Sequence, residues 1–108
     1  MSIKLILVTS PDLPTAHSLA EGLLDKDLVA CVNLIPSVVS LYKWEGKLEQ
    51  NVEVQMFLKT SERNITAIES YVNEHHPYEV PEFLVIDVNH GNRDYLNWVQ
   101  EMTSQGNK

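Results

Sequence analysis

The chain of 108 residues lacks the features that mark several common classes of protein. Its eight lysines and arginines form no cluster, and fifteen acidic residues give a formal net charge of -7. Nucleic acid and anionic membranes attract basic surfaces, so we expect neither as a partner. The longest early apolar run, Leu5–Val8, is too short for a signal peptide or for a membrane span of about 20 residues. We therefore expect a cytoplasmic protein.

Cysteine is also scarce, because Cys31 is the only one in the chain. A single cysteine excludes an internal disulfide and fits a reducing compartment. It lies in a strand-like run, where a free cysteine usually acts as a small buried hydrophobe; a reactive or metal-binding thiol is the alternative. The sequence has no G-x-S-x-G, C-x-x-C or H-E-x-x-H motif and no glycine-rich phosphate loop. Nothing in it indicates an enzyme.

What the chain does have is a hydrophobic content of 44%, enough for one core in one domain over residues 1–108. Runs of apolar residues with strand or helix spacing predict the secondary structure. The first expected elements are a central strand over Ile3–Thr9, a helix from Leu13 to about Asp27 capped by Ser10 or Asp12, and a long hairpin. A second helix, capped by Ser61, should end before Pro77, and a strand over Phe83–Val88 should follow it. A short helix from Gly91, with Tyr95, Leu96 and Val99 inward, and a frayed tail from Thr103 should end the chain.

The hairpin spans residues 30–60, with Glu45 and Gly46 as a two-residue loop between alternating runs. Counting outward from that loop predicts the facing pairs Trp44 and Lys47, Tyr42 and Glu49, Val39 and Val52, and Val32 and Lys59. Each strand would be about twice the usual length of roughly 5 to 6 residues. The end of the hairpin should therefore project beyond the core as an arm.

The projecting arm carries Leu41, Tyr42, Trp44 and Leu48. Apolar side chains on an exposed, two-stranded arm favour aggregation unless another subunit covers them. We therefore expect an obligate homo-oligomer with these residues in its interface. The alternative is a bulge or bend at Pro36 that folds the arm back onto its own core.

The predicted order of strand, helix, two strands, helix and strand is the βαββαβ unit of ferredoxin-like domains, an α+β fold with helices on one face of an antiparallel sheet. Here it has a long hairpin between its second and third strands and an extra C-terminal helix. Alternation along the third strand points Val52, Val54, Met56 and Leu58 one way and Glu53, Gln55, Phe57 and Lys59 the other. The second, mixed set suits a subunit interface or a cleft.

The segment 74–82 is richest in groups that can bind or react, because it holds His75, His76, Tyr78 and several carboxylates. Adjacent helical residues point about 100° apart, so the two histidines need a further ligand from elsewhere to share one metal ion. A neighbouring chain could supply it. The alternative is a helix C-terminus where histidine complements the helix dipole. Lys59 could hold an anion, pair with Glu82, or only keep a strand end soluble.

Taken together, these stretches resemble the CutA family of divalent-cation tolerance proteins, and the resemblance covers nearly the whole chain. The individual matches are weak, but their order and spacing are specific. They are Ala30-Cys31-Val32-Asn33 with Pro36; Ser40, Tyr42, Trp44 and Gly46; Glu53 with Lys59-Thr60; His76-Pro77-Tyr78 with Pro81-Glu82; and Tyr95 with Trp98.

The resemblance implies a ferredoxin-like subunit, a homotrimer joined through extended strands, and a link to copper tolerance. Copper ligands proposed in the family map to Val8, His75 and His76. Some relatives have cysteine where this chain has Val8, and valine cannot ligate a metal, so a site of that design lacks its soft ligand. Trimers of this kind are similar to the PII signalling proteins, which bind small effectors between subunits.

Two functions follow as expectations. The first is a cytoplasmic homotrimer that binds a divalent metal, copper in particular, through His75 and His76 and acts in metal tolerance. The second is a PII-like signalling module with a small effector in a cleft between subunits formed by Lys59, Tyr78 and Glu82. In both, the partners are further copies of the chain and a small ligand, without nucleic acid or membrane.

Overall fold

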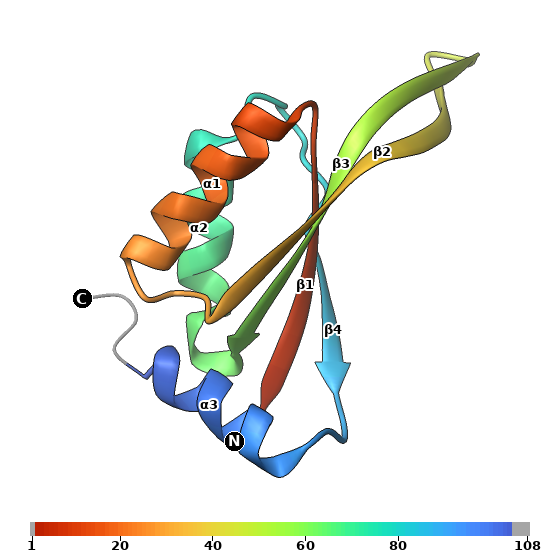
Figure 1. Cartoon of the computed structure of the whole chain (residues 1–108). Helices are drawn as coiled ribbons and strands as arrows, with labels where there is room; N and C mark the ends of the chain where they lie inside the picture. Colours follow the sequence, from red (N-terminus) through yellow and green to blue (C-terminus); the bar gives the residue numbers. More distant parts are fainter. Residues whose placement is uncertain (1, 105–108) are drawn as a thin grey trace.

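The computed structural model describes residues 2–104 and consists of an antiparallel sheet with helices on one face (Figure 1). The sheet has the strand order β2-β3-β1-β4, so β1 lies inside it as predicted. The helices α1 and α2 cover one face, and α3 lies at one end of the sheet. This order confirms the ferredoxin-like α+β fold with an extra C-terminal helix. The elements are β1 (Ile3–Ser10), α1 (Leu13–Asp25), β2 (Cys31–Trp44), β3 (Lys47–Ser61), the 3-10 helix η1 (Glu62–Asn64), α2 (Ile65–His75), β4 (Leu84–Val88) and α3 (Arg93–Met102).

The main core lies between the sheet and the helices α1 and α2. Ile6 of β1 and Leu58 of β3 face each other in the register and are fully buried, and Leu23 of α1 and Ile68 of α2 cover them. Burial of a large aliphatic side chain contributes about 1.5–3 kcal/mol. This layer holds the helix pair on the sheet and so fixes the position of the C-terminal end of α2.

The two predicted helix caps have different outcomes. Asp12 caps α1, because its carboxylate accepts a hydrogen bond of 2.9 Å from the backbone N–H of Thr15. The predicted cap of the second helix, Ser61, is wrong. Its side chain makes no cap bond and instead bonds the hydroxyl of Thr103 at 3.0 Å, while η1 leads the chain into α2 after Asn64.

The hairpin turn is a type I′ turn, since Glu45 and Gly46 have φ angles of 51° and 80°. Three of the predicted facing pairs are confirmed: Trp44 with Lys47, Tyr42 with Glu49, and Val39 with Val52. The fourth is wrong, because Val32 faces Leu58 and Cys31 faces Lys59.

A bulge between Ile35 and Val38 shifts the register by one residue. Pro36, which has no N–H to donate, lies in this bulge, and Ser37 takes a left-handed φ of 64°. The bulge predicted as an alternative at Pro36 is therefore present. It does not fold the arm back, because the tip projects away from the rest of the molecule (Figure 1).

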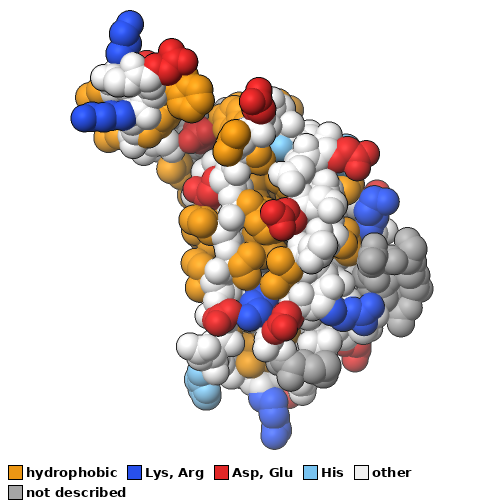
Figure 2. Space-filling view, turned by 180° about the vertical axis from the view of Figure 1, so that it is seen from behind, with side chains coloured by type: hydrophobic (Ala, Val, Ile, Leu, Met, Phe, Trp, Pro, Cys, Tyr) orange, Lys and Arg blue, Asp and Glu red, His pale blue; other side chains and the backbone are white. Residues whose placement is uncertain are grey.

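The arm exposes the four predicted interface residues: Leu41 is 62%, Tyr42 40%, Trp44 63% and Leu48 72% exposed. In the space-filling view the arm stands clear of the body and carries hydrophobic side chains next to charged ones (Figure 2). Leu41 and Leu48 share one face with Val39 and Val52, as the register shows. We call Val39, Leu41, Leu48 and Val52 the aliphatic row.

The aliphatic row continues the buried face of the sheet. Along β3, Leu58, Met56 and Val54 lie beneath the helices and are buried, whereas Val52, the next residue on that face, is 61% exposed. No helix among residues 2–104 covers the row beyond Val54. The row has the composition of a core but lacks a cover within one chain.

The third helix closes the end of the sheet. Val99 is buried against Ile3 and Ala30, and Leu96 packs beside them, as predicted. Tyr95 was expected inward but is 42% exposed. Thr103, expected to begin a frayed tail, is fully buried and bonds the carbonyl of Val99; the rest of that expected tail, residues 105–108, lies outside the described part of the chain.

Candidate functional site

His75, the last residue of α2, is exposed and has one free ring nitrogen. Its Nδ1 lies 2.9 Å from the carbonyl oxygen of Tyr71, and its ring stacks on the Tyr71 ring with centroids 4.0 Å apart. A carbonyl only accepts hydrogen bonds, so Nδ1 carries the proton and Nε2 keeps its lone pair. Nε2 of neutral imidazole is a common metal ligand. His75 can therefore offer one ligand at the surface.

Gly22 of α1 makes room for the tyrosine that holds His75 in place. A Cβ at Gly22 would lie 1.7 Å from the hydroxyl oxygen of Tyr71. The glycine, which weakens a helix interior by about 1 kcal/mol, therefore has a packing reason. The stacked pair Tyr71 and His75 depends on this contact between α1 and α2.

His76, the C-cap of α2, points inward and uses both ring nitrogens. It is 7% exposed, and its Nδ1 accepts a hydrogen bond of 3.0 Å from the backbone N–H of Tyr78. Nδ1 is therefore unprotonated, and Nε2 donates to the carbonyl oxygen of Thr9 at 2.7 Å. In this arrangement His76 ties the end of α2 to the end of β1. It has no lone pair left for a metal unless one of these bonds breaks.

The other position of the expected copper set is Val8, which is 1% exposed and packs in the main core. No group of three or more histidine, cysteine, aspartate or glutamate side chains within the described part of the chain is placed to hold one ion. The ligands present in a single copy therefore do not fit a complete metal site. Use of His75 and His76 together as ligands stays a prediction.

A second cluster of polar side chains joins the loop after α2 to β3. The hydroxyl of Tyr78 donates to the carboxylate of Glu53 at 2.7 Å, and the amide of Gln55 donates to Glu82 at 3.0 Å. Gln55 also donates to the carbonyl of Val8 at 3.2 Å. Two of the predicted cleft residues, Tyr78 and Glu82, are thus bound to Glu53 and Gln55, which lie two residues apart on β3.

Sequence reasoning missed Glu53 and Gln55 as the partners of this loop. The signal was available in part, because alternation along β3 already placed both on the mixed face and Glu53 is one of the residues that carry the family resemblance. Which loop residue each one meets depends on packing between distant segments.

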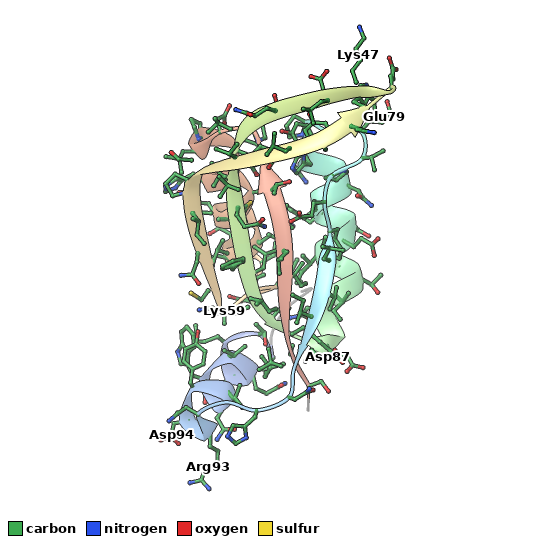
Figure 3. The ribbon with its side chains drawn as sticks, turned by 90° about the vertical axis from the view of Figure 1, so that its right-hand side faces the viewer. Lys47, Lys59, Glu79, Asp87, Arg93 and Asp94 are labelled. Atoms are coloured by element: carbon green, nitrogen blue, oxygen red, sulfur yellow. The ribbon has the colours of Figure 1, made fainter. Side chains whose placement is uncertain are left out.

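Lys59 does not join this group. It lies on β3 beyond Gln55, about 13 Å along a strand, and its ammonium is 5.6 Å from the centre of the Tyr95 ring. Figure 3 places Lys59 near α3 and Glu79 near the arm, at opposite ends of the sheet. Pairing with Glu82, one of the alternatives for Lys59, does not occur within one chain, where Glu82 accepts from Gln55. Within one chain the three predicted cleft residues do not share a cleft.

The environment of the Tyr78 hydroxyl makes the stability of the folded chain sensitive to pH above 10. Burial first, and then the hydrogen bond to Glu53, raises the pKa of Tyr78 to about 12 from an ordinary value of 10. The folded state therefore favours the neutral phenol. Its stabilising contribution is complete below pH 10 and is lost as the pH rises from 10 towards 12.

We expect the free energy of unfolding of the wild type to fall between pH 10 and pH 12 more steeply than that of Tyr78→Phe. Urea unfolding at several pH values measures the difference, and each variant is compared with itself at pH 8. Parallel curves for the two proteins would show that Tyr78 titrates alike in the folded and unfolded states.

Comparison with known proteins agrees with this fold. The family model described as CutA1 divalent ion tolerance protein matches residues 4–102. The curated "Divalent-cation tolerance protein CutA" of Escherichia coli is 51% identical over 94 residues, which are 87% of this chain and 84% of the relative.

Solved structures of relatives have the same architecture. CutA1 from Oryza sativa superposes with a TM-score of 0.93 at 33% identity and covers 95% of this chain and 94% of its own. The "Periplasmic divalent cation tolerance protein CutA" from Archaeoglobus fulgidus gives a TM-score of 0.90 at 34% identity and covers 94% of this chain and 98% of its own. The matched family model, the sequence identity and the shared fold agree: the chain belongs to the CutA1 divalent ion tolerance family.

Proposed function

We propose that this protein acts in tolerance to divalent cations as a cytoplasmic homotrimer that binds copper and catalyses no reaction. The observation that carries the metal-binding part is the exposed His75, whose Nε2 lone pair is free because Nδ1 bonds the Tyr71 carbonyl. Imidazole nitrogen suits copper among the divalent metals. The named function of the Escherichia coli relative supports the same role.

The trimer is supported by the uncovered aliphatic row on the arm. Its four members are each more than half exposed, and a row of this kind on a protruding hairpin needs a cover. Assembly would also bear on the metal site. Within residues 2–104 of one copy, His75 has no two further histidine, cysteine or carboxylate side chains placed to share an ion with it, so further ligands have to come from another copy or from solvent.

A cytoplasmic location is supported by the single cysteine and the acidic composition. Among residues 2–104 no helix is long and apolar enough to cross a membrane. The Archaeoglobus fulgidus relative carries the word periplasmic in its name. Fractionation of cells that express the protein from its native gene tests the location directly.

For the metal site, we expect His75→Ala to weaken Cu(II) binding at least tenfold in isothermal titration calorimetry. The reason is the loss of the one exposed imidazole whose second nitrogen is fixed by a backbone carbonyl. His90→Ala is the matched control, because His90 is also exposed but lies in the loop before α3. Equal loss of affinity in both variants, or no loss in His75→Ala, would contradict the assignment.

The second candidate function is the binding of a small effector between subunits. It is favoured by the part-buried polar group of Tyr78, Glu53, Gln55 and Glu82. Because Lys59 lies at the other end of the sheet, a cleft that contains both would take Lys59 from a neighbouring copy. A thermal-shift screen of metals against nucleotides and organic acids separates the two functions, since a ligand of the folded protein raises its melting temperature.

A further inference from the structure

A further candidate binding site lies between α1 and α2, on the helix side of the sheet. It is a pocket of about 430 Å³, within the usual range of about 300–1,000 Å³ for small-molecule sites. One wall is a stripe along η1 and α2 whose members recur every three or four residues and so share one face: Arg63, Thr66, Ala67, Ser70, Tyr71 and Glu74. The other wall is formed by Lys26, the C-cap of α1, and by Leu28. The pocket therefore has room for a small organic molecule.

The two cationic side chains of the pocket lie at the same end of it. The side-chain amide of Asn64 donates to the carbonyl of Leu28 at 3.2 Å, so the loop after α1 is held against the start of α2. This bond places Lys26, two residues before Leu28, at the end of the pocket that Arg63 lines. Glu74 follows the first residue of α2 by nine positions, about 14 Å along the helix axis. The pocket thus has a cationic end and an acidic end.

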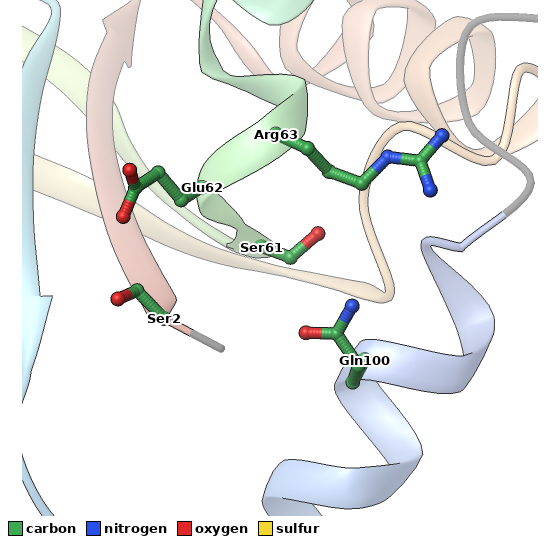
Figure 4. A pocket seen from close by; sticks show the side chains of 5 residues that line it. All are labelled: Ser2, Ser61, Glu62, Arg63 and Gln100. Atoms are coloured by element: carbon green, nitrogen blue, oxygen red, sulfur yellow. The ribbon is translucent and has the colours of Figure 1, made fainter.

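Neither cation is neutralised by a carboxylate within the described part of the chain. The ion pairs among residues 2–104 are both made by Lys4. Arg63 extends away from Glu62 (Figure 4) and donates one N–H to the backbone carbonyl of Ser104 at 2.7 Å. Its guanidinium has five N–H donors, and the ammonium of Lys26 has three. Two like charges that share a pocket repel each other, and an anion bound between them lowers that energy.

We propose that this pocket binds the phosphate group of a small organic phosphate. At pH 7 a phosphate monoester carries a charge of about -1.5 to -2, which matches two cationic side chains, whereas a carboxylate carries only one negative charge. The phosphate oxygens accept hydrogen bonds from Arg63, Lys26 and the hydroxyl of Thr66. The carbon part of the ligand extends along α2 over Ala67 and Tyr71.

The site is separate from the two proposed functions. Glu53 and Gln55 of the candidate effector cleft alternate along β3 with the buried Val54 and so point to the other side of the sheet. The imidazole of His75 takes no part in the phosphate site. The formal net charge of -7 repels anions from the surface in general, so anion binding confined to this pocket is a specific result.

Phenyl phosphate, benzoate and benzyl alcohol are suitable probes, since each has one aromatic ring and they carry about two, one and no negative charges at pH 8. We expect NMR titration of the full chain at constant ionic strength to show binding of phenyl phosphate, with the largest backbone amide shifts near Lys26 and Thr66. Benzoate and benzyl alcohol should bind at least tenfold more weakly. Inorganic phosphate should also bind more weakly, because it lacks a ring to pack on Tyr71. No binding of phenyl phosphate, or equal affinity for any of the other three probes, would overturn the proposal.

Lys26→Gln tests the cationic end, since it removes the charge and keeps most of the length of the side chain. We expect at least tenfold weaker binding of phenyl phosphate and an unchanged fold, because Lys26 is exposed. Lys47→Gln is the matched control, because it removes the same charge from an exposed lysine on the arm (Figure 3) and should leave the affinity unchanged. Thr66→Val removes one donor at the same size and should weaken binding severalfold. Equal losses in Lys26→Gln and Lys47→Gln would show that binding follows the overall charge of the chain and would contradict a site in this pocket.

Discussion

Replacement of both Leu41 and Leu48 by glutamate is expected to convert the proposed trimer into monomers. The two side chains are 62% and 72% exposed in one chain and lie on the same face of the arm. If a neighbouring copy covers them, each contributes about 1.5–3 kcal/mol of apolar burial. Their combined loss of about 3–6 kcal/mol weakens association by roughly two to four powers of ten. Sedimentation velocity at low micromolar concentration measures the change.

The control for this variant is Gln50→Glu. Gln50 faces Leu41 across the arm and is itself exposed, so the substitution adds a negative charge to the same face without removal of an apolar side chain. We expect it to stay trimeric. A monomeric wild type would contradict the proposed assembly, and a double variant that sediments with the wild type would show that the aliphatic row lies outside the interface.

Much of the fold was predictable because its signals are local. Alternation along residues 52–58 identifies the buried face of β3, and the Glu45-Gly46 pair fixes the turn and the register next to it. Asp12 before a helical run indicates a cap from three residues away. These features depend on neighbours in sequence, so a short stretch of the chain contains the information.

The register beyond Pro36 was not predictable by counting from the turn. A bulge adds one residue to β2 and moves every later pair by one, so that Cys31 rather than Val32 faces Lys59. Pro36 is a signal for such a bulge, but a proline also fits a bend or an edge strand. Packing of the strand on both sides of Pro36 decides whether a bulge, a bend or a regular edge strand forms.

The candidate site was predictable in its residues but not in its contacts. The adjacent positions of His75 and His76 indicated that their side chains diverge, and they do. The partner of His76, the carbonyl of Thr9, lies 67 residues earlier in the chain, and no spacing rule connects them. The same holds for the bond between Tyr78 and Glu53, 25 residues apart.

His76→Leu is expected to destabilise the protein more than any other single substitution in the site. The variant removes the His76 partner of the carbonyl of Thr9, which is buried, and of the backbone N–H of Tyr78, which is partly buried. An unpaired buried group costs about 1–3 kcal/mol and a partly buried one somewhat less, so the free energy of unfolding should fall by roughly 2–5 kcal/mol. Urea unfolding followed by circular dichroism at fixed protein concentration measures it.

Two further variants show whether the hydrogen bonds or the metal explain the loss. His76→Gln can donate through its amide and accept through its carbonyl, so we expect it to recover part of the stability. His75→Leu removes an exposed imidazole and should cost no more than about 1 kcal/mol, the usual contribution of one hydrogen bond. A chelator in the buffer removes any contribution of bound copper. Under that condition a structural His76 still gives the large loss, whereas a His76 that acts only as a ligand gives a loss as small as that of His75→Leu.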